Sequence, residues 1–587
     1  MKGPSRMILF FLCGCPAGPT EKSPVAYESA DEDTETGSTE SDTGACVTQT
    51  WYLDLDGDGY GDPGEEVSVC NAPDGYVGDA HDCNDANSDV YSGAPEICLD
   101  GLINDCDDIG GLAAAAACPL DGPYRVASAD GRLLGEADGD FVGSVLASAG
   151  DVDGDGHDDL LVGAPYAGVA YRVMGPVSGA ISLGVSATRV TDPGLAGWSV
   201  ANAGDQDGDG FPDMLVGVQQ GGEARQGQAL LVLGTNVGDL TVGDVDAVLS
   251  GESEDDFAGQ SVAGIGDMDG DGWDDLAVGA VYVTGSSVDS TLGDCATADR
   301  EEYSGEYGIS AGAVYLLRGP VSGDMSLAMA DARVVGEDGA DYLGYRLGGQ
   351  GDLNGDGVPD LLMSAIGQCE GGLDAGAIYV MNGPVSGDLS AADADRKVLG
   401  SGRRELAGQV LSVAGDVNGD GYGDFVVGNS YGDGPEGGHQ GVAWLIFGPG
   451  TGVSELAAAE GSLWGEMEAS NAGASVASAG DTNRDGFDDL LVGASGDSTE
   501  ATYGGAAYLV HGPITGYSNL SGAAAKFNGS ESLEHVGSSV AGGGDVDGDG
   551  LLDLWIGAIG DSEAAHWAGA VSLILGGGPM LTGGYGP

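Results

Sequence analysis

Short apolar stretches recur along most of the chain and indicate a repeated pattern of strands. One example, residues 160–164, follows an acidic stretch, is partly β-branched and ends near a glycine. Such short runs predict buried strands rather than helices. A stretch of small residues precedes the acidic stretch, as in residues 142–150, and two more apolar stretches follow it, as in residues 312–317 and 332–336. We therefore predict four antiparallel strands per unit.

The unit occurs seven times, and its regular spacing predicts a ring of blades. The acidic stretches begin at Asp151, Asp205, Asp267, Asp352, Asp416, Asp481 and Asp545. Successive starts lie 54, 62, 85, 64, 65 and 64 residues apart, and the longest interval reflects an insertion at about residues 284–310. Repeated four-stranded units are typical of β-propellers. We predict an all-β fold with a seven-bladed propeller over residues 121–587.

Each acidic stretch has the composition of a cation-binding loop. In the first copy, residues 151–159, carboxylates stand at loop positions 1, 3, 5 and 9, and glycines stand at positions 4 and 6. Oxygens at alternate positions suit a hard cation of flexible geometry, which indicates Ca²⁺, and the second glycine permits a sharp turn. Position 7 varies among His157, Phe211, Trp273 and other types. We interpret position 7 as contributing only its backbone carbonyl.

The predicted ligands differ slightly between copies, because Asn replaces Asp at position 3 in three loops and Arg484 replaces one glycine. They are Asp151, Asp153, Asp155 and Asp159; Asp205, Asp207, Asp209 and Asp213; Asp267, Asp269, Asp271 and Asp275; Asp352, Asn354, Asp356 and Asp360; Asp416, Asn418, Asp420 and Asp424; Asp481, Asn483, Asp485 and Asp489; and Asp545, Asp547, Asp549 and Asp553.

Two other interpretations of the loops fit less well. An EF-hand requires a bidentate Glu at position 12 and flanking helices, but Val162 occupies position 12 of the first copy and the flanks read as strands. A solvated Asp-Gly turn would be a fair interpretation of one copy, although not of seven at matching places. We expect the cation to be structural and to couple to folding, with affinities of about 10⁻⁴ to 10⁻³ M.

The same units resemble the FG-GAP repeats of the integrin alpha-subunit propeller. The resemblance rests on the calcium loops, on degenerate Phe-Gly elements at residues 141–143 and 257–259, and on the Gly-Ala-Pro of residues 163–165. It implies a seven-bladed propeller with Ca²⁺ held between the first two strands of each blade, and no inserted ligand domain is visible. Residues 131–136 have the sequence of a fourth strand, which we predict completes blade seven and closes the ring.

The charge balance restricts the class of partner. The chain of 587 residues carries 95 acidic against 18 basic residues, a formal net charge of −77. Nucleic acid is excluded as a partner because it requires a basic surface. No His-Glu-x-x-His, Gly-x-Ser-x-Gly or phosphate-binding loop is present, so we predict no enzyme and no catalytic residue. A hydrolase that uses carboxylates alone is the least favoured alternative.

The amino terminus resembles a bacterial lipoprotein signal. Residues 7–12 form an apolar run that is too short to span a bilayer, and residues 12–15 resemble a lipobox in which Cys15 would be acylated. An ordinary cleaved signal or a mis-assigned start remains open. We expect a signal peptide over residues 1–15 and a disordered acidic linker over residues 16–45. The protein would be an outer-membrane lipoprotein at the cell surface, anchored only by lipid, or be secreted.

Residues 46–120 form a predicted cysteine-rich domain. Its six cysteines suggest three disulfides of unknown pairing. A further loop offers the same 1-3-5-9 spacing, with predicted ligands Asp54, Asp56, Asp58 and Asp62. A second acidic group between Asp82 and Asp107 completes a resemblance to the MopE-like metal-binding motif of myxobacterial and methanotroph surface proteins. Part of that family is linked to copper, but the oxygen ligands here favour Ca²⁺; a merely solvated surface stays an alternative for the second group.

The propeller holds two cysteines, Cys295 and Cys369, for which we prefer a disulfide over two free thiols. For the whole protein we expect a calcium-stabilised, monomeric surface protein of recognition or adhesion that binds an extracellular protein or glycan on one propeller face. Tyr303 and Tyr307 in the insertion give modest support. The alternative is a structural envelope component with no specific ligand.

Overall fold

The computed structural model describes residues 48–57, 59–81, 120, 122–284, 310–433 and 438–576. The first described segment forms a small antiparallel sheet in the order β2-β1-β3, with β1 (Gln49–Leu53), β2 (Asp62–Val69) and β3 (Tyr76–Val77). The acidic loop that begins at Asp54 joins its first two strands. This sheet is separate in its hydrogen bonding from all the sheets that follow.

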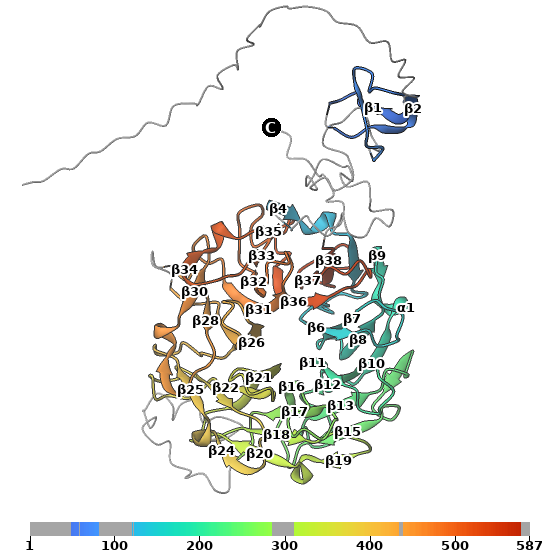
Figure 1. The fold of residues 1–587 in the computed structure, drawn as a ribbon. Coiled ribbons are helices and arrows are strands. Elements are labelled where there is room, and N and C mark those ends of the chain that lie inside the picture. The colour runs from blue at the N-terminus through green and yellow to red at the C-terminus, as the bar shows by residue number, and fades with distance from the viewer. Residues whose placement is uncertain are drawn as a thin grey trace, which may run out of the picture.

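Seven five-stranded sheets lie in a ring around a common centre, which makes the fold a β-propeller (Figure 1). We number the blades in chain order by their acidic loops. The innermost strands are β6 (Val145–Gly150), β11 (Ala196–Gly204), β16 (Ala258–Gly266), β21 (Leu343–Gly351), β26 (Val410–Gly415), β31 (Ala472–Gly480) and β36 (Val536–Gly544). The second strands are β7 (Asp159–Ala164), β12 (Asp213–Val218), β17 (Asp275–Ala280), β22 (Asp360–Ala365), β27 (Asp424–Asn429), β32 (Asp489–Ala494) and β37 (Asp553–Ala558).

The third and fourth strands complete the antiparallel part of each blade, as predicted. The third strands are β8 (Val169–Val173), β13 (Gln228–Val232), β18 (Ala313–Leu317), β23 (Ala377–Met381), β28 (Val442–Ile446), β33 (Ala506–Val510) and β38 (Ala570–Ile574). The fourth strands are β10 (Thr188–Thr191), β15 (Ala247–Ser250), β20 (Ala332–Val335), β25 (Arg396–Leu399), β30 (Gly461–Trp464), β35 (Ala525–Asn528) and, for blade 7, β5 (Gly131–Leu134).

A fifth, parallel strand on the outer edge was not foreseen from the sequence. In blades 1 to 5 the fifth strand is the segment of chain just before the fourth strand of the next blade. The chain therefore crosses the junction between two neighbouring blades at this point. The fifth strands are β14 (Asp239–Thr241), β19 (Met325–Ser326), β24 (Gly387–Ser390), β29 (Gly452–Glu455), β34 (Gly516–Asn519), β4 (Gly122–Arg125) and β9 (Gly179–Ser182). A single helical turn often follows, as in α1 (Leu183–Ser186) and η5 (Ala391–Asp393).

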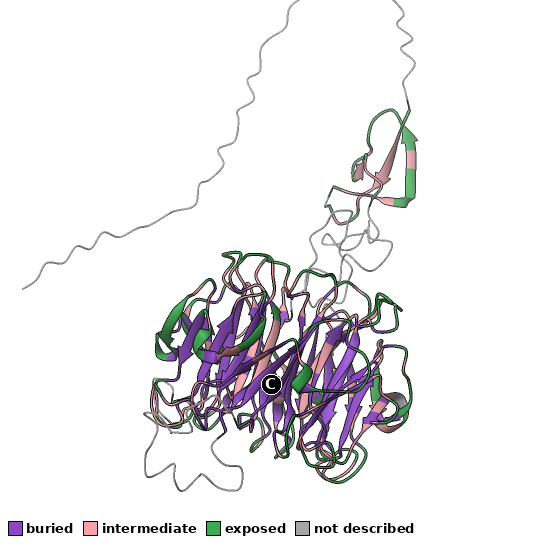
Figure 2. Ribbon diagram, turned by 90° about the horizontal axis from the view of Figure 1, so that it is seen from below, coloured by how far each residue is buried: buried purple, intermediate pink, exposed green. Residues whose placement is uncertain are grey.

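The hydrophobic core lies between the blades rather than within any one of them. Seven apolar clusters occur, and each combines side chains of two neighbouring sheets. One cluster joins Leu160 and Tyr171 of blade 1 to Trp555 and Val571 of blade 7. Figure 2 shows the buried strands lying between the two faces of the ring, with exposed loops at both faces. Because both faces of a second strand are covered, its sequence after the initial aspartate is mostly apolar and lacks alternation.

The amino-terminal segment of the propeller closes the ring. β5 pairs antiparallel with β38, and Leu133 lies opposite Val571, which confirms the predicted fourth strand of blade seven. β4, which comes just before it, pairs parallel with β35 of blade six. Residues 122–134 therefore bind two blades from the other end of the chain, and the ring has no open seam between blades six and seven.

The predicted disulfides involve cysteines that lie outside the described residues. Cys70 and Cys369 are each disulfide-bonded, and their partners lie outside the described residues. The pairing of Cys369 with Cys295 and the pairing in the cysteine-rich domain stay predictions, as do the proposed domain boundaries. Among the described residues no helix is both long and apolar enough to cross a membrane.

Deleting residues 121–138 should open the ring, because it removes β4 and β5 together. We expect a lower melting temperature and a larger hydrodynamic radius in the presence of Ca²⁺. Leu133→Ala is a milder test: the side chain is fully buried, so its loss should cost about 2–5 kcal/mol of unfolding free energy. Val185→Ala, at an exposed position, is the control. An unchanged melting temperature of the deletion variant would refute ring closure by this segment.

Candidate metal centres

The seven acidic loops lie at one end of the ring, because each joins the innermost strand of its blade to the second strand. We call this end the metal-loop face. The opposite face carries the connections between second and third strands, such as residues 165–168 of blade 1. Sequence reasoning therefore placed the loops correctly between the first two strands of every blade.

Hydrogen bonds within each loop turn its carboxylates inward. In blade 1, Asp151 Oδ1 accepts from the Gly154 N–H at 2.7 Å, and its Oδ2 accepts from the Gly156 N–H at 3.0 Å. Asp155 Oδ1 accepts from the His157 N–H at 3.0 Å. Both glycines have positive φ, 75° and 90°, which explains their recurrence at positions 4 and 6. The loop is thus shaped by its own backbone donors.

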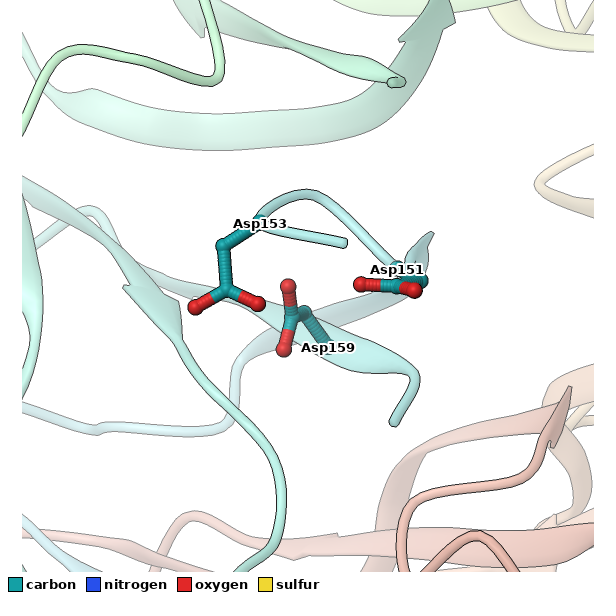
Figure 3. Close-up of side chains that lie close together, drawn as sticks. All are labelled: Asp151, Asp153 and Asp159. Atoms are coloured by element: carbon teal, nitrogen blue, oxygen red, sulfur yellow. The ribbon is translucent and has the colours of Figure 1, made fainter. Parts of the chain in front are cut away.

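Three carboxylates converge in four of the loops. In blade 1 Asp151, Asp153 and Asp159 point toward one another, and their nearest oxygens all lie within 4.8 Å (Figure 3). The sets are Asp151, Asp153 and Asp159; Asp205, Asp207 and Asp213; Asp267, Asp269 and Asp271; and Asp545, Asp547 and Asp549. Oxygen donors at such spacing fit a hard divalent cation. The sequence predicted four ligands per loop, and the structure brings three of these side chains together in each set.

The aspartate at position 9 also anchors the loop. Asp159, the first residue of β7, is buried and accepts from the Val152 N–H at 2.9 Å and from the Gly175 N–H at 2.8 Å. Its equivalents make the same two kinds of bond in every blade: Asp213, Asp275, Asp360, Asp424, Asp489 and Asp553. Position 9 therefore ties the loop to the turn after the third strand, a role that the spacing alone did not reveal.

Burial raises the pKa of this aspartate throughout the ring. The pKa reaches about 6 for Asp159, about 7 for Asp424 and about 8 for Asp553, and neighbouring loop carboxylates add to the effect of burial. The ionised form is thus disfavoured where the loop stands alone. A cation would favour it, so these sites match a bound positive charge.

The loops with Asn at position 3 are arranged differently. The Asn354 amide donates to Asp360 Oδ1 at 3.2 Å, and the Asn483 amide donates to Asp485 Oδ2 at 3.0 Å. Arg484 adopts φ 58° and donates from Nη2 to the Gly550 carbonyl at 2.6 Å. These amides compete with a cation for carboxylate oxygens, so blades 4 and 6 offer weaker candidate sites than blade 1.

The amino-terminal loop shares part of the pattern. Asp54 accepts from the Gly57 N–H at 2.7 Å and from the Gly59 N–H at 3.3 Å, as position 1 does in the propeller. Asp62 accepts from the Gly64 N–H at 2.6 Å. Asp56 is described, whereas Asp58 and the whole second acidic group lie outside the described residues. Metal binding in this loop stays a prediction.

The side chain at position 7 has a packing role. Its side chain packs on the position-4 glycine of the preceding loop: a Cβ on Gly154 would lie 2.5 Å from the Phe211 ring, and one on Gly419 would lie 2.3 Å from the Phe487 ring. Trp273, Tyr422 and His157 cover Gly208, Gly355 and Gly548 in the same way. The interpretation that position 7 contributes only its backbone carbonyl is therefore wrong for these five loops.

Position 8 links neighbouring loops through hydrogen bonds. Asp158 Oδ2 accepts from the Asp545 N–H at 2.8 Å, and the Asp158 N–H donates to the Asp545 carbonyl at 2.9 Å, which joins blade 1 to blade 7. Asp488 does the same to Asp416. The aspartate just before position 9 is visible in the sequence. Its role could not be read there, because its hydrogen-bond partner belongs to a neighbouring blade.

Comparison with known proteins agrees with this geometry. The FG-GAP repeat family matches residues 142–183, 196–232, 407–446 and 472–510, and the family described as "Putative metal-binding motif" matches residues 82–110. The nematode Caenorhabditis elegans integrin alpha pat-2 is 30% identical over 239 residues, covering 40% of this chain and 18% of that protein. Integrin alpha-PS2 of Drosophila melanogaster is 35% identical over 173 residues, covering 27% of this chain and 12% of that protein.

The chain thus contains FG-GAP repeats, is integrin-alpha-like over part of its length and carries a metal-binding motif. The matched region covers less than a fifth of either integrin relative. A chain in the crystal structure of BBS1N in complex with ARL6DN, soaked with mercury, matches with a TM-score of 0.40 and 10% identity, covering 75% of this chain and 93% of that chain.

Removal of divalent cations should destabilise the propeller, and one substitution should isolate a single loop. Asp207→Asn removes one converging carboxylate, yet three other loops already hold Asn at position 3, so the fold should persist. Free ligand at 100 times the dissociation constant stabilises by about 2.7 kcal/mol. We expect the rise in melting temperature between chelator and millimolar Ca²⁺ to shrink in this variant. Equal melting temperatures of the wild type in the two buffers would contradict a structural metal.

Asp158→Ala tests the contacts between loops. It removes the hydrogen bond that the Asp158 carboxylate accepts from the Asp545 N–H across the junction of blades 1 and 7 and keeps the backbone bond, so unfolding free energy in Ca²⁺ should fall by about 1.5–3 kcal/mol. Asp244→Ala is the matched control, because Asp244 accepts only within its own turn, from Thr241. An unchanged unfolding free energy of Asp158→Ala would show that the contact between loops contributes nothing of its own.

Proposed function

We propose that this protein is a calcium-stabilised extracellular recognition or adhesion protein, whose protein or glycan ligand binds the face opposite the metal loops. The observation that carries the proposal is that the loops at the two ends of the ring differ in kind. At one end seven similar loops direct their carboxylates inward. At the other end the loops differ from blade to blade, which is how rigid scaffolds present binding surfaces.

The opposite face carries connections of unequal length and several exposed aromatic side chains. The link between second and third strands is residues 165–168 in blade 1 but residues 281–312 in blade 3. Tyr166, Tyr431 and Tyr503 lie on these links and are 66%, 69% and 45% exposed. Tyrosine is enriched in recognition surfaces because it offers a large apolar body with a polar tip. Tyr303 and Tyr307 lie outside the described residues.

Calcium is the cation that best suits the loops. Every converging group consists of carboxylates, and the remaining candidates are backbone or amide oxygens, which are ligands for hard cations. Copper would call for nitrogen or sulfur ligands, and no converging group in the described ranges contains His or Cys. The cation then holds the scaffold, and ligand contact falls to the other face.

The similarity to integrin alpha chains supports an extracellular setting and adhesion, although it covers a small part of those proteins. Anchoring through an acylated Cys15, or secretion, is consistent with that setting and remains part of the proposal. The monomeric state is also part of the proposal. The alternative is a structural envelope protein whose ring needs calcium but no ligand.

The test is a binding screen of the full chain against glycans, matrix proteins and the producer's own envelope, in millimolar Ca²⁺ and in chelator. We expect saturable binding that needs Ca²⁺ and weakens at least about tenfold in Tyr166→Ala or Tyr431→Ala. Tyr517→Ala is the control, because Tyr517 is equally exposed (66%) but lies on the outer strand β34. No binding by folded, calcium-loaded protein would favour the structural role instead.

A further inference from the structure

A channel of about 480 Å³ runs through the centre of the ring, and its wall differs chemically from the rest of the protein. All seven innermost strands line it, largely with serine, alanine, glycine and valine. Within the described part of the chain no Asp or Glu lines this channel, although acidic residues outnumber basic ones by 95 to 18 overall. One cation, Arg346 of β21, does line it.

Arg346 stands where four other blades have a serine that is already engaged. Two residues after the glycine that opens the strand, Ser199, Ser261 and Ser475 each donate to a glycine carbonyl of the next blade, at 3.0, 2.7 and 2.9 Å. Ser539 donates to the Gly143 carbonyl in the same way. These hydroxyls serve the packing of the ring. In blade 4 the arginine breaks this pattern.

A second change in blade 4 supports the arginine's backbone and leaves its side chain available. The second strands of the six other blades carry a glycine where blade 4 has the buried Ser364. At one of these glycines, Gly217, a Cβ would lie 2.3 Å from the neighbouring Gly259 carbonyl. Ser364 Oγ instead accepts from the Arg346 N–H at 3.0 Å. The local packing is therefore satisfied without the guanidinium.

The guanidinium has little protein contact of its own. Nη1 donates to the Tyr345 carbonyl at 3.3 Å, and the group lies 5.3 Å from the centre of the Tyr345 ring. No ion pair joins it to a carboxylate among the described residues, whereas Arg333 and Lys397 pair with Glu252 and Glu337. A half-buried guanidinium with five N–H donors and no carboxylate partner is suited to bind an external anion.

We propose that the central channel binds a small organic monocarboxylate through Arg346. The guanidinium fork matches a carboxylate in a bidentate arrangement. The channel volume lies in the range of small-molecule sites, about 300–1,000 Å³, and Trp198 supplies apolar surface in its wall. One cation inside a chain of formal charge −77 favours a singly charged ligand, because the surrounding field opposes polyanions such as phosphate. This site is separate from the surface proposed above for a macromolecular ligand.

The experiment uses the full, calcium-loaded chain with benzoate as the probe and benzamide as its neutral analogue. Calorimetric titration should show saturable binding of one benzoate per chain and at least about tenfold weaker binding of benzamide. Arg346→Gln should weaken benzoate binding at least about tenfold, and Arg346→Lys should keep part of it. Arg225→Gln is the matched control, because that exposed arginine pairs with Asp255 outside the channel. It should bind benzoate as the wild type does.

Several outcomes would overturn the proposal. These are the absence of saturable benzoate binding, equal binding of benzamide, undiminished binding by a folded Arg346→Gln variant, or stronger competition by inorganic phosphate than by acetate. If Arg346→Gln does not fold, the wild-type comparison of benzoate with benzamide and the Arg346→Lys variant still decide the matter. Melting temperature in Ca²⁺ reports folding for each variant.

Discussion

Crowded carboxylates are the constraint on which this structure depends. In four loops three aspartates bring oxygens within 4.8 Å of one another. Two unit charges about 4 Å apart repel by roughly 4 kcal/mol at an effective dielectric constant of about 20, so backbone donors alone hold such a loop poorly. Burial is the main cause of the raised pKa of the position-9 aspartates, about 8 for Asp553, and the neighbouring loop carboxylates raise that pKa further. A divalent cation would resolve this conflict between like charges and would make the stability of the ring depend on its ionic surroundings.

The conflict matters beyond each loop, because the loops are joined to one another. Phe211 of blade 2 covers Gly154 of blade 1, and Asp158 of blade 1 binds the backbone of Asp545 in blade 7. The apolar clusters likewise belong to pairs of blades. A loop that lost its shape would disturb its neighbour, so a cation bound in one blade would support packing in the next. Closure by β4 and β5 gives this chain of contacts no free end at blades six and seven.

Much of this could be predicted from the sequence, because the relevant contacts are local. The four-stranded unit, the loop between its first two strands and the closing strand at residues 131–136 all follow from short patterns that recur at matching places. The fifth strands, the aromatic cover at position 7 and the role of Asp158 could not be predicted in this way. Each of them is a contact between blades, and its partner stands about one repeat away in sequence, or at the far end of the chain.

Several of the few basic side chains also form contacts between neighbouring blades. Glu252, at the end of the fourth strand of blade 2, pairs with Arg333 of blade 3 at 3.3 Å. The same relation joins Glu337 to Lys397 at 2.9 Å and Glu466 to Lys526 at 3.1 Å. Burial lowers the pKa of Lys397, but hydrogen bonds to Glu370 and Glu337 outweigh it and the net shift is upward. Such pairs neutralise acidic side chains between blades where no metal loop reaches. Arg346 lines the channel and has no carboxylate partner among the described residues, so it differs from these paired basic residues. Its charge therefore serves something other than the fold.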